Sequence, residues 1–527
     1  MKRLILLVIL GMPGLSRAQV LEWFYTYNGP SNLWDRAEKV LIDGTGGIYI
    51  MGLTDRGRGI TRDWGGDIFI AKLDTLGNEK WVYTYDGLGH GYDKPSDMLL
   101  DGHGNIYIAG DAYVDSSNKT DIVAIKLDTA GNEQWAYAYD LDTPGFSVEY
   151  SNSLAFDTSG NLYVAGSVIA DAIDSDATVF TVLSVDTAGV FRWWFIYPPG
   201  PRDLGSGPNA DVVIADSNGE VYTCGLVQDS VAPGWYEHVF VVVKLDSLGN
   251  LVWKWWDSYE CEYCDEGLIE LDSSGYLYGV AMDGLDTYYF KMDTSGDIIW
   301  GYLYDEPDGA ENMCLTSEGL YSCGWYFPGM PGPGEEDFMV AKVGLDGSFQ
   351  WGRLFDSHGL DKGGWAWDIS DNSVGDLFAV GDTENYGFAV KLTNSGAVKW
   401  AYTYPERSTF KSVAPDLSGA IYIAGAVDQD SLTREESTDI LVIKLRDTVA
   451  AVTEPNPSAR VPERMTLSVA PEGFLISGYE GPVQVYDATG RLILSREIEG
   501  KTLISPLKPG VYFVKAGRQR GRVAVLR

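Results

Sequence analysis

The chain has 527 residues, a formal net charge of −36 and a hydrophobic content of 45%. This length exceeds one ordinary core, so it predicts several domains or one closed repeat array, and the apolar content argues against disorder for most of the chain. The negative charge repels phosphates and anionic lipids, so nucleic acid and membrane surfaces are poor partners.

Residues 1–18 have the pattern of a cleaved export signal. Two basic residues precede an apolar run over 4–10, and Ser16 and Ala18 fit the small-residue rule for cleavage before Gln19. The run is too short to span a bilayer, and no later stretch is long enough. We expect an exported chain without a membrane span, located outside the cell or at its outer surface; a retained anchor is the alternative.

A ten-residue unit recurs along the chain. It is DGTGGIYIMG at 43–52 and DGHGNIYIAG at 101–110, and close copies stand at 157–166, 216–225, 272–281 and 416–425. We interpret each copy as an Asp-x-x-Gly turn followed by a strand, because Asp bonds nearby backbone N–H groups and Gly supplies positive φ. Calcium ligation is the competing interpretation, but a calcium loop needs several oxygen ligands and each turn offers one carboxylate.

Two aromatic series count the units. One is Tyr49, Tyr107, Tyr163, Tyr222, Tyr278, Tyr321, Phe378 and Tyr422; the other is Trp23, Trp81, Trp135, Trp193, Trp253, Trp300, Trp351 and Trp400. A spacing of 43 to 60 residues with four strands per unit is typical of propeller blades. The chain opens with a lone fourth strand at 21–29, and the eighth unit stops after its third strand at 439–446.

We therefore predict an all-β fold in which residues 19–446 form an eight-bladed β-propeller of four-stranded blades. The N-terminal strand completes the last blade and removes its exposed edge. The fifth to seventh units are degenerate, so seven or nine blades are the alternatives.

A lysine recurs in the third strand of most units, at Lys72, Lys126, Lys244, Lys291, Lys342, Lys391 and Lys444. Ser184 replaces it in the third unit. A residue repeated at equivalent depth around a ring cannot define one site. We expect its stem to lie on a neighbouring blade and its ammonium to pair with a local Asp.

Five cysteines are few for an exported chain of this size, so disulfides are not its framework. Cys224 and Cys323 take the place of alanines in other copies, which predicts small buried side chains. Cys314 and Cys323 flank a tight turn and could form a cross-strand disulfide. The pair Cys261 and Cys264 has CxxC spacing but lacks a second pair or a nearby His, so we predict no metal site there.

The repeat pattern D-x-x-G-N-x-Y-V-A-G, followed by D-x-x-x-x-K-L-D-x-x-G-x-x-x-W, resembles the bacterial SBBP-type β-propeller repeats over residues 21–446. The resemblance implies the fold and almost nothing about function, because such propellers are mostly uncharacterised exported or surface proteins. The family's usual ring has seven blades, and the count of eight here departs from it.

Residues 447–462 are interpreted as a linker, and 463–527 as a small β-sandwich of short strands. The pieces EPNPS at 454–458, VQVYDATGRLI at 483–493 and LKPGVYFVKAG at 507–517 resemble the type A C-terminal sorting domain of the type IX secretion system. That resemblance implies export across the outer membrane with the secretion machinery as a partner. A generic appended sandwich is the alternative.

No catalytic, cofactor-binding or metal-binding residue is assigned from the sequence. Only four histidines are present, and no zinc, nucleophile-elbow or phosphate-loop motif occurs. The repeat breaks at 198–202, at 328–336, at the CEYC stretch and at GGWAWD (363–368). Trp365 and Trp367 alternate there and are expected to pack between blades rather than to stack sugars.

The favoured hypothesis is a non-catalytic surface propeller that binds protein or glycan through a loop face. An exported polysaccharide hydrolase or lyase and a structural or adhesion component are the alternatives. The fold cannot choose among them.

Overall fold

The computed structural model describes most of the ring and the strands of the C-terminal module. The described residues are 19–56, 66–114, 120–140, 146–170, 177–197, 209–232, 235–256, 267–283, 286–304, 309–326, 336–355, 364–383, 385–428, 437–447, 466–470, 473–477, 481–487, 491–498, 502–504, 510–516 and 519–525. All regular elements among them are β-strands. No helix of the described residues is long and apolar enough to cross a membrane.

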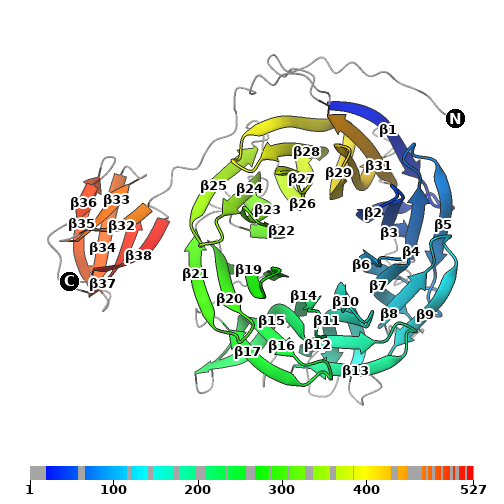
Figure 1. The fold of residues 1–527 in the computed structure, drawn as a ribbon, viewed down its shortest axis with the longest axis horizontal. Helices are drawn as coiled ribbons and strands as arrows, with labels where there is room; N and C mark the ends of the chain where they lie inside the picture. Colours follow the sequence, from blue (N-terminus) through cyan, green and yellow to red (C-terminus); the bar gives the residue numbers. More distant parts are fainter. Residues whose placement is uncertain are drawn as a thin grey trace.

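The strands form a closed ring of eight blades, as the sequence predicts (Figure 1). Six blades are separate four-stranded antiparallel sheets, and one seven-stranded sheet supplies the other two. In each blade the first strand lies nearest the centre and the fourth lies at the circumference (Figure 1).

The first four blades take up residues 34–256. Blade 1 contains β2 (Trp34–Ile42), β3 (Ile48–Arg56), β4 (Asp67–Leu73) and β5 (Glu79–Tyr85). Blade 2 contains β6 (Lys94–Leu100), β7 (Ile106–Tyr113), β8 (Thr120–Leu127) and β9 (Glu133–Tyr139). Blade 3 contains β10 (Phe146–Phe156), β11 (Leu162–Ala170), β12 (Ala177–Val185) and β13 (Phe191–Ile196). Blade 4 contains β14 (Asn209–Ala215), β15 (Val221–Ala232), β16 (Trp235–Leu245) and β17 (Leu251–Trp256).

The remaining blades complete the ring. Blade 5 contains β18 (Gly267–Leu271), β19 (Tyr276–Asp283), β20 (Asp286–Asp293) and β21 (Ile298–Tyr304). Blade 6 contains β22 (Gly309–Thr316), β23 (Gly319–Tyr326), β24 (Asp337–Val343) and β25 (Phe349–Phe355). Blade 7 contains β26 (Gly364–Asp371), β27 (Asp376–Thr383), β28 (Tyr386–Thr393) and the first part of β29 (Val398–Pro415). Blade 8 contains the second part of β29, β30 (Ala420–Asp428), β31 (Thr438–Asp447) and β1 (Gln19–Tyr27).

The two ends of the propeller segment close the ring. Strand β1 pairs antiparallel with β31 from Gln19 opposite Asp447 to Tyr27 opposite Ile440. The predicted completion of the last blade by the N-terminal strand is therefore confirmed. Main-chain pairing at this point leaves no unpaired edge on β31, since β30 covers its other side.

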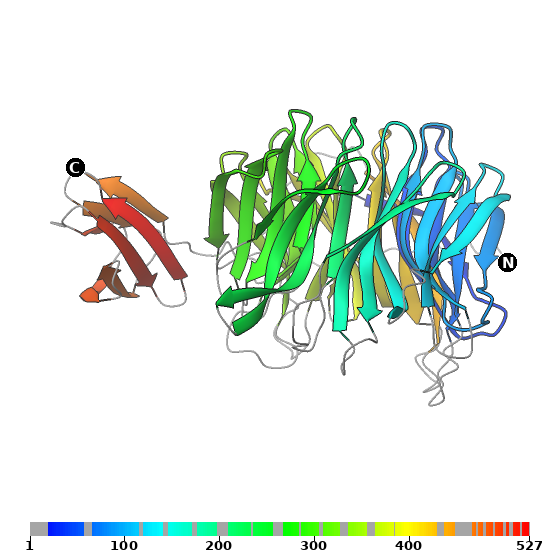
Figure 2. The ribbon, with the colours of Figure 1, turned by 90° about the horizontal axis from the view of Figure 1, so that it is seen from below.

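The antiparallel order also separates two faces of the ring. The Asp-x-x-Gly turns join first to second and third to fourth strands, so they share one face, which we call the turn face. The connections from second to third strands and from blade to blade share the opposite face, which we call the loop face. Figure 2 shows the strands running between these two faces.

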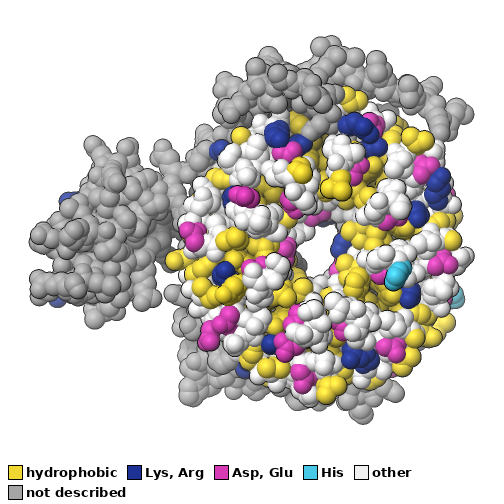
Figure 3. All heavy atoms as spheres, viewed as in Figure 1, with side chains coloured by type: hydrophobic (Ala, Val, Ile, Leu, Met, Phe, Trp, Pro, Cys, Tyr) yellow, Lys and Arg dark blue, Asp and Glu magenta, His cyan; other side chains and the backbone are white. Residues whose placement is uncertain are grey.

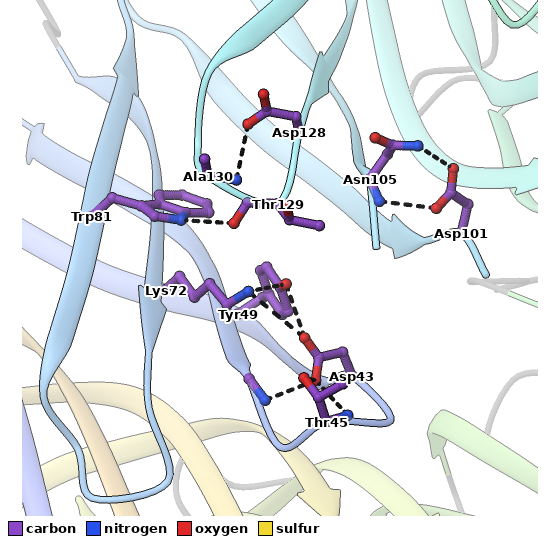
Figure 4. A network of polar contacts seen from close by, with 11 residues as sticks. Asp43, Thr45, Tyr49, Lys72, Trp81, Asp101, Asn105, Asp128, Thr129 and Ala130 are labelled. Carbon is purple, nitrogen blue, oxygen red and sulfur yellow. Dashed lines mark hydrogen bonds and ion pairs between the residues drawn. The ribbon is translucent and has the colours of Figure 1, made fainter. Parts of the chain in front are cut away.

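Neighbouring blades are joined by the repeated tryptophan. The indole N–H of Trp81 in blade 1 donates to the Thr129 carbonyl in the turn of blade 2, at 3.2 Å (Figure 4). Gly131 of that turn has a φ of 82°, and a Cβ there would lie 2.5 Å from the Trp81 ring. The same bond joins Trp23 to Thr75, Trp135 to Thr187, Trp193 to Ser247, Trp253 to Thr294, Trp300 to Leu345 and Trp351 to Asn394. The turn glycine thus adopts the positive φ of the turn and also leaves room for the indole ring of the preceding blade.

The repeated lysine has the expected structural role, with one difference. Its ammonium lies over the aromatic ring of its own blade, as with Lys72 at 4.5 Å from the centre of the Tyr49 ring. Lys72 also pairs with Asp43 at 3.7 Å (Figure 4). The ring that it covers belongs to its own blade, because strands two and three of one blade are hydrogen-bonded side by side. The expected contact with a neighbouring blade is made by the ammonium groups of Lys244, Lys342 and Lys444, which donate to turn carbonyls of the next blade.

Blade 3 lacks this lysine and replaces its charge from another strand. Arg192, in β13, donates to the Ser184 hydroxyl at 3.0 Å and to the Tyr163 hydroxyl at 3.4 Å. It also donates to the Ser247 carbonyl of the next blade at 3.2 Å. The cationic position is thus kept although the sequence position has changed.

The C-terminal module consists of two antiparallel sheets, which agrees with the predicted sandwich. One sheet contains β32 (Thr466–Ala470), β33 (Gly473–Ser477) and β36 (Thr502–Ile504). The other contains β34 (Gly481–Asp487), β35 (Leu492–Ile498), β37 (Gly510–Ala516) and β38 (Gln519–Val525). Val483 and Val485 of β34 are fully buried.

Candidate functional site: the inner strands of the ring

The first strands of the blades lie around the centre of the ring (Figure 1), where the space-filling view shows an opening (Figure 3). In seven blades this strand has a β-bulge at an equivalent position, where one residue is inserted between two residues paired with the second strand. The inserted residues are Glu38, Ser96, Asn152, Asp211, Glu311, Trp367 and Lys411. We call this set the bulge ring. Its backbone repeats, whereas its side chains differ from blade to blade.

The last glycine of the ten-residue unit accompanies the bulge. A Cβ at Gly381 would lie 1.8 Å from the Trp365 carbonyl oxygen, and one at Gly52 would lie 2.3 Å from the Arg36 carbonyl oxygen. Only a residue without a side chain lets the bulged strand approach so closely. In blade 5 this position is Ala281, and β18 pairs with β19 without a register shift. The sequence therefore encodes the bulge through this glycine.

Blades 6 to 8 give the ring its most distinctive side chains. Trp365 and Trp367 of β26 have ring centres 5.1 Å apart, and Trp365 lies 6.1 Å from Trp325 of β23. The Lys411 ammonium of β29 lies 3.0 Å from the centre of the Trp367 ring. We call Trp325, Trp365, Trp367 and Lys411 the indole arc. All four are partly exposed.

The arc confirms the expected contacts of Trp365 and Trp367 with neighbouring blades. Trp365 contacts blade 6 and Trp367 contacts blade 8 through these rings and Lys411. Both indoles nevertheless keep exposed surface on the innermost strand, so they are not closed core residues. Such partly exposed aromatic side chains beside polar groups are typical of ligand sites.

Carboxylates and a glycine hold the indoles in place. The Trp325 indole N–H donates to Glu311 at 3.2 Å, and the Trp367 indole N–H donates to Asp382 at 2.9 Å. A Cβ at Gly309 would lie 2.2 Å from the Trp325 ring, so glycine lets this ring lie against β22. The arc is therefore a built arrangement and not a chance cluster.

Burial and charge together set the electrostatics of the arc. Desolvation, followed by repulsion from Arg36, lowers the pKa of Lys411 to about 8. Glu38, Asp382 and Glu311 act in the opposite direction on this pKa. Burial raises the pKa of Asp382, although its bond from Trp367 opposes the shift. The site thus disfavours charge on both its cation and its buried acid.

Other inner-strand polar groups join neighbouring blades. Asp97 accepts the Leu154 backbone N–H at 2.9 Å, and Asp368 accepts the Val413 backbone N–H at 2.8 Å. In blade 5, Glu270 accepts the Leu315 backbone N–H at 3.1 Å, and burial raises its pKa to about 7. These groups have structural partners, so we do not place them in the candidate site.

Two acidic clusters lie where adjacent blades meet on the loop face. Asp67, Asp86 and Asp93 have oxygens within 4.8 Å of one another, as do Asp121, Asp140 and Glu149. Both oxygens of Asp93 accept backbone N–H groups, from Gly87 and Tyr113. Asp35, the equivalent residue of blade 1, binds the Gly29 and Asp55 N–H groups in the same way. The repeated role of this aspartate is to fix the chain between blades.

The Asp-x-x-Gly turns show the expected turn chemistry (Figure 4). Asp101 accepts the His103 N–H at 2.8 Å and the Asn105 N–H at 2.9 Å with one oxygen, and the Asn105 side chain with the other. His103 is an exposed turn residue. Because both carboxylate oxygens have partners within the turn, the turn interpretation is favoured over calcium ligation.

The cysteine predictions have different outcomes. Cys224 and Cys323 are fully buried, as predicted. The proposed Cys314–Cys323 disulfide is wrong, because both thiols are free. The hairpin register places Cys314 opposite Tyr321 and Cys323 opposite Asn312, so the two cysteines are not directly paired.

Some sequence-predicted regions lie outside the described residues. These are Cys261 and Cys264, the insert at 198–202, residues 328–335 and Gly363. Glu311, Trp325, Asp382 and Lys411 were not singled out by sequence reasoning. The signal that could have revealed them was the final glycine of the unit, because Glu311 and Lys411 are bulge residues opposite such a glycine and Trp325 and Asp382 directly follow one.

Comparison with known proteins shows no family for this chain. No family model matches the chain, and no curated protein matches it. The chain is similar to a Dyadobacter fermentans protein of unknown function, at 10% identity and a TM-score of 0.37, over 83% of this chain and 100% of that one. It is similar to Drosophila Plexin A in complex with Semaphorin 1b, at 9% identity and a TM-score of 0.41, over 82% and 88%. It is also similar to the NanB sialidase from Streptococcus pneumoniae, at 12% identity and a TM-score of 0.37, over 81% and 70%. The sheet order described above shows that the chain is a β-propeller.

Proposed function

We propose that this protein is an exported, non-catalytic propeller that binds a carbohydrate at the indole arc. The observation that supports the site is the departure from symmetry: the bulge repeats around the ring, but within the described residues three indoles and a lysine meet only in blades 6 to 8. Indole faces match the apolar C–H faces of sugar rings, and the neighbouring acids and amine can bond hydroxyl groups.

The state of the carboxylates supports binding without catalysis. Glycoside hydrolysis uses two carboxylates that flank the scissile bond, one of them as an acid. Here Asp382 and Glu311 each accept an indole N–H. Their role in the arc is to hold Trp367 and Trp325, so we assign neither to proton transfer.

Export is supported by the sequence at both ends. Residues 1–18 have the export-signal pattern, and strands β32 to β38 belong to a module whose sequence resembles a type IX sorting domain. We propose that the secretion machinery recognises this module and delivers the SBBP-like propeller to the cell surface.

The test is a glycan array probed with residues 19–527 and with Trp367→Ala. We expect binding to a subset of glycans that Trp367→Ala loses. The control is Tyr137→Ala, which removes a half-exposed aromatic side chain from the outer strand of blade 2. Equal loss in both variants, or binding to envelope proteins but to no glycan, would contradict the proposal. Turnover of any bound polysaccharide would favour the hydrolase or lyase instead.

A further inference from the structure

We propose that the carbohydrate bound by the indole arc carries a carboxylate, and that Lys411 holds this group. This inference rests on the proposed function. It assigns a ligand class, an acidic sugar, to the site. A neutral sugar, which is the alternative ligand, would stack on the same indoles.

The first observation is the position of two cations on adjacent inner strands. Arg36 is on β2 and Lys411 is on β29, and these strands contact each other at the junction of blades 8 and 1. The Arg36 charge opposes protonation of Lys411. Glu38, Asp382 and Glu311 act in the opposite direction, and Arg36 is bonded to Glu38, so Lys411 is the cation of this pair that an incoming anion would stabilise.

The second observation is that Lys411 has no carboxylate partner. Within the described residues, Lys411 makes no ion pair; its short contact is with the Trp367 ring. The nearby acids have other donors: Glu38 pairs with Arg36 at 2.5 Å, and Asp382 and Glu311 accept indole N–H groups. A ligand carboxylate would therefore provide the charged partner that Lys411 lacks.

The third observation is steric. The Lys411 ammonium lies 3.0 Å from the centre of the Trp367 ring and covers that face. A sugar ring stacking there must displace the ammonium, which loses a cation–π contact. A neutral sugar offers only hydroxyl groups in exchange. An acidic sugar offers a charge-assisted hydrogen bond, so displacement of Lys411 favours it.

Binding should also take up a proton in alkaline solution. The groups that face Lys411 are Arg36 and Glu38 from β2, Asp382 from β27 and Glu311 from β22. Burial leaves the amine partly neutral near pH 8, and a bound carboxylate would hold it protonated. Affinity for the acidic sugar should therefore fall as the pH rises through this range.

The experiment compares matched ligands by calorimetry at pH 7 and pH 9. The probes are β-1,4-linked hexasaccharides of glucuronic acid and of glucose, which differ at C6. We expect the acidic ligand to bind at least about tenfold more tightly, because one charge-assisted bond is worth that factor. Lys411→Gln should abolish the preference and the proton uptake at pH 9. Lys80→Gln, which removes an exposed lysine of an outer strand, is the control and should change neither.

The outcomes separate the two proposals. If both hexasaccharides bind equally and Lys411→Gln has no effect, the acidic-sugar inference is wrong and the carbohydrate site stands. If the acidic ligand binds more tightly but Lys80→Gln weakens it as much as Lys411→Gln does, the preference comes from general charge and the inference is also wrong. If neither ligand binds, nor any other matched acidic and neutral pair on the array, both proposals are overturned.

Discussion

Substitution of Gly381 by alanine tests whether this glycine creates the bulge that presents Trp367. The added Cβ would lie 1.8 Å from the Trp365 carbonyl oxygen, whereas a close C···O contact is about 3.3–3.6 Å. Strands β26 and β27 would have to separate locally by roughly 1.5 Å, given that contact distance. Overpacking costs about 1–3 kcal/mol, and the loss of a ladder hydrogen bond adds about 1 kcal/mol. We expect Gly381→Ala to lower the free energy of unfolding by about 3 kcal/mol.

The assay is urea unfolding followed by tryptophan fluorescence, with Gly102→Ala as the matched control. A Cβ at Gly102 meets nothing within 4 Å, so this variant should lie within about 0.5 kcal/mol of the parent protein. Ala281→Gly in blade 5, where no bulge exists, should cost only about 0.5–1 kcal/mol. If Gly381→Ala unfolds at the same urea concentration as Gly102→Ala, the steric explanation of the bulge ring is refuted.

Three further predictions concern the ring, its pH dependence and its export. Deletion of 19–27 should expose the edge of β31 and cause self-association, measured by analytical ultracentrifugation; a monomer of unchanged stability would show that β1 is dispensable. Burial raises the pKa of Glu270 to about 7, so its folded form binds a proton more readily than the unfolded chain does. The free energy of unfolding should therefore fall as the pH rises from about 4.5 to 7. Glu270→Gln should reduce this dependence of the free energy on pH in urea titrations, and an unchanged dependence would exclude Glu270 as its source. Deletion of 463–527 should retain the propeller inside the source cells, as detected by surface protease accessibility, whereas continued surface exposure would contradict the sorting role.

The sequence predicts the architecture well because the elements that build it recur in every unit. The spacing of Trp23, Trp81 and their equivalents counts the blades, and the lone first strand predicts closure. The same residues then join the blades through their indole N–H groups. A repeated, local signal is thus sufficient to predict a repeated fold.

The candidate site could be predicted only in part, because it depends on residues brought together from three blades. Trp367 attracts notice as part of GGWAWD, but two strands separate it in the chain from each of its partners Trp325 and Lys411. The sequence pattern explains the glycine of the Asp-x-x-Gly turn, whereas the last glycine of the ten-residue unit permits the bulge. Blade 5 supports this role of the last glycine, because Ala281 replaces it there and the bulge is absent.

The continuous strand β29 affects how the indole arc can respond to a ligand. Its first part pairs with β28 and its second part with β30, so blades 7 and 8 share one backbone without an intervening loop. Trp367 and Lys411 consequently stand on a single seven-stranded sheet. Hinge motion between these two blades is thereby suppressed, and opening of the indole face must come from rotation of the lysine side chain. A ligand would therefore meet a fixed Trp367 ring and a Lys411 side chain that can rotate.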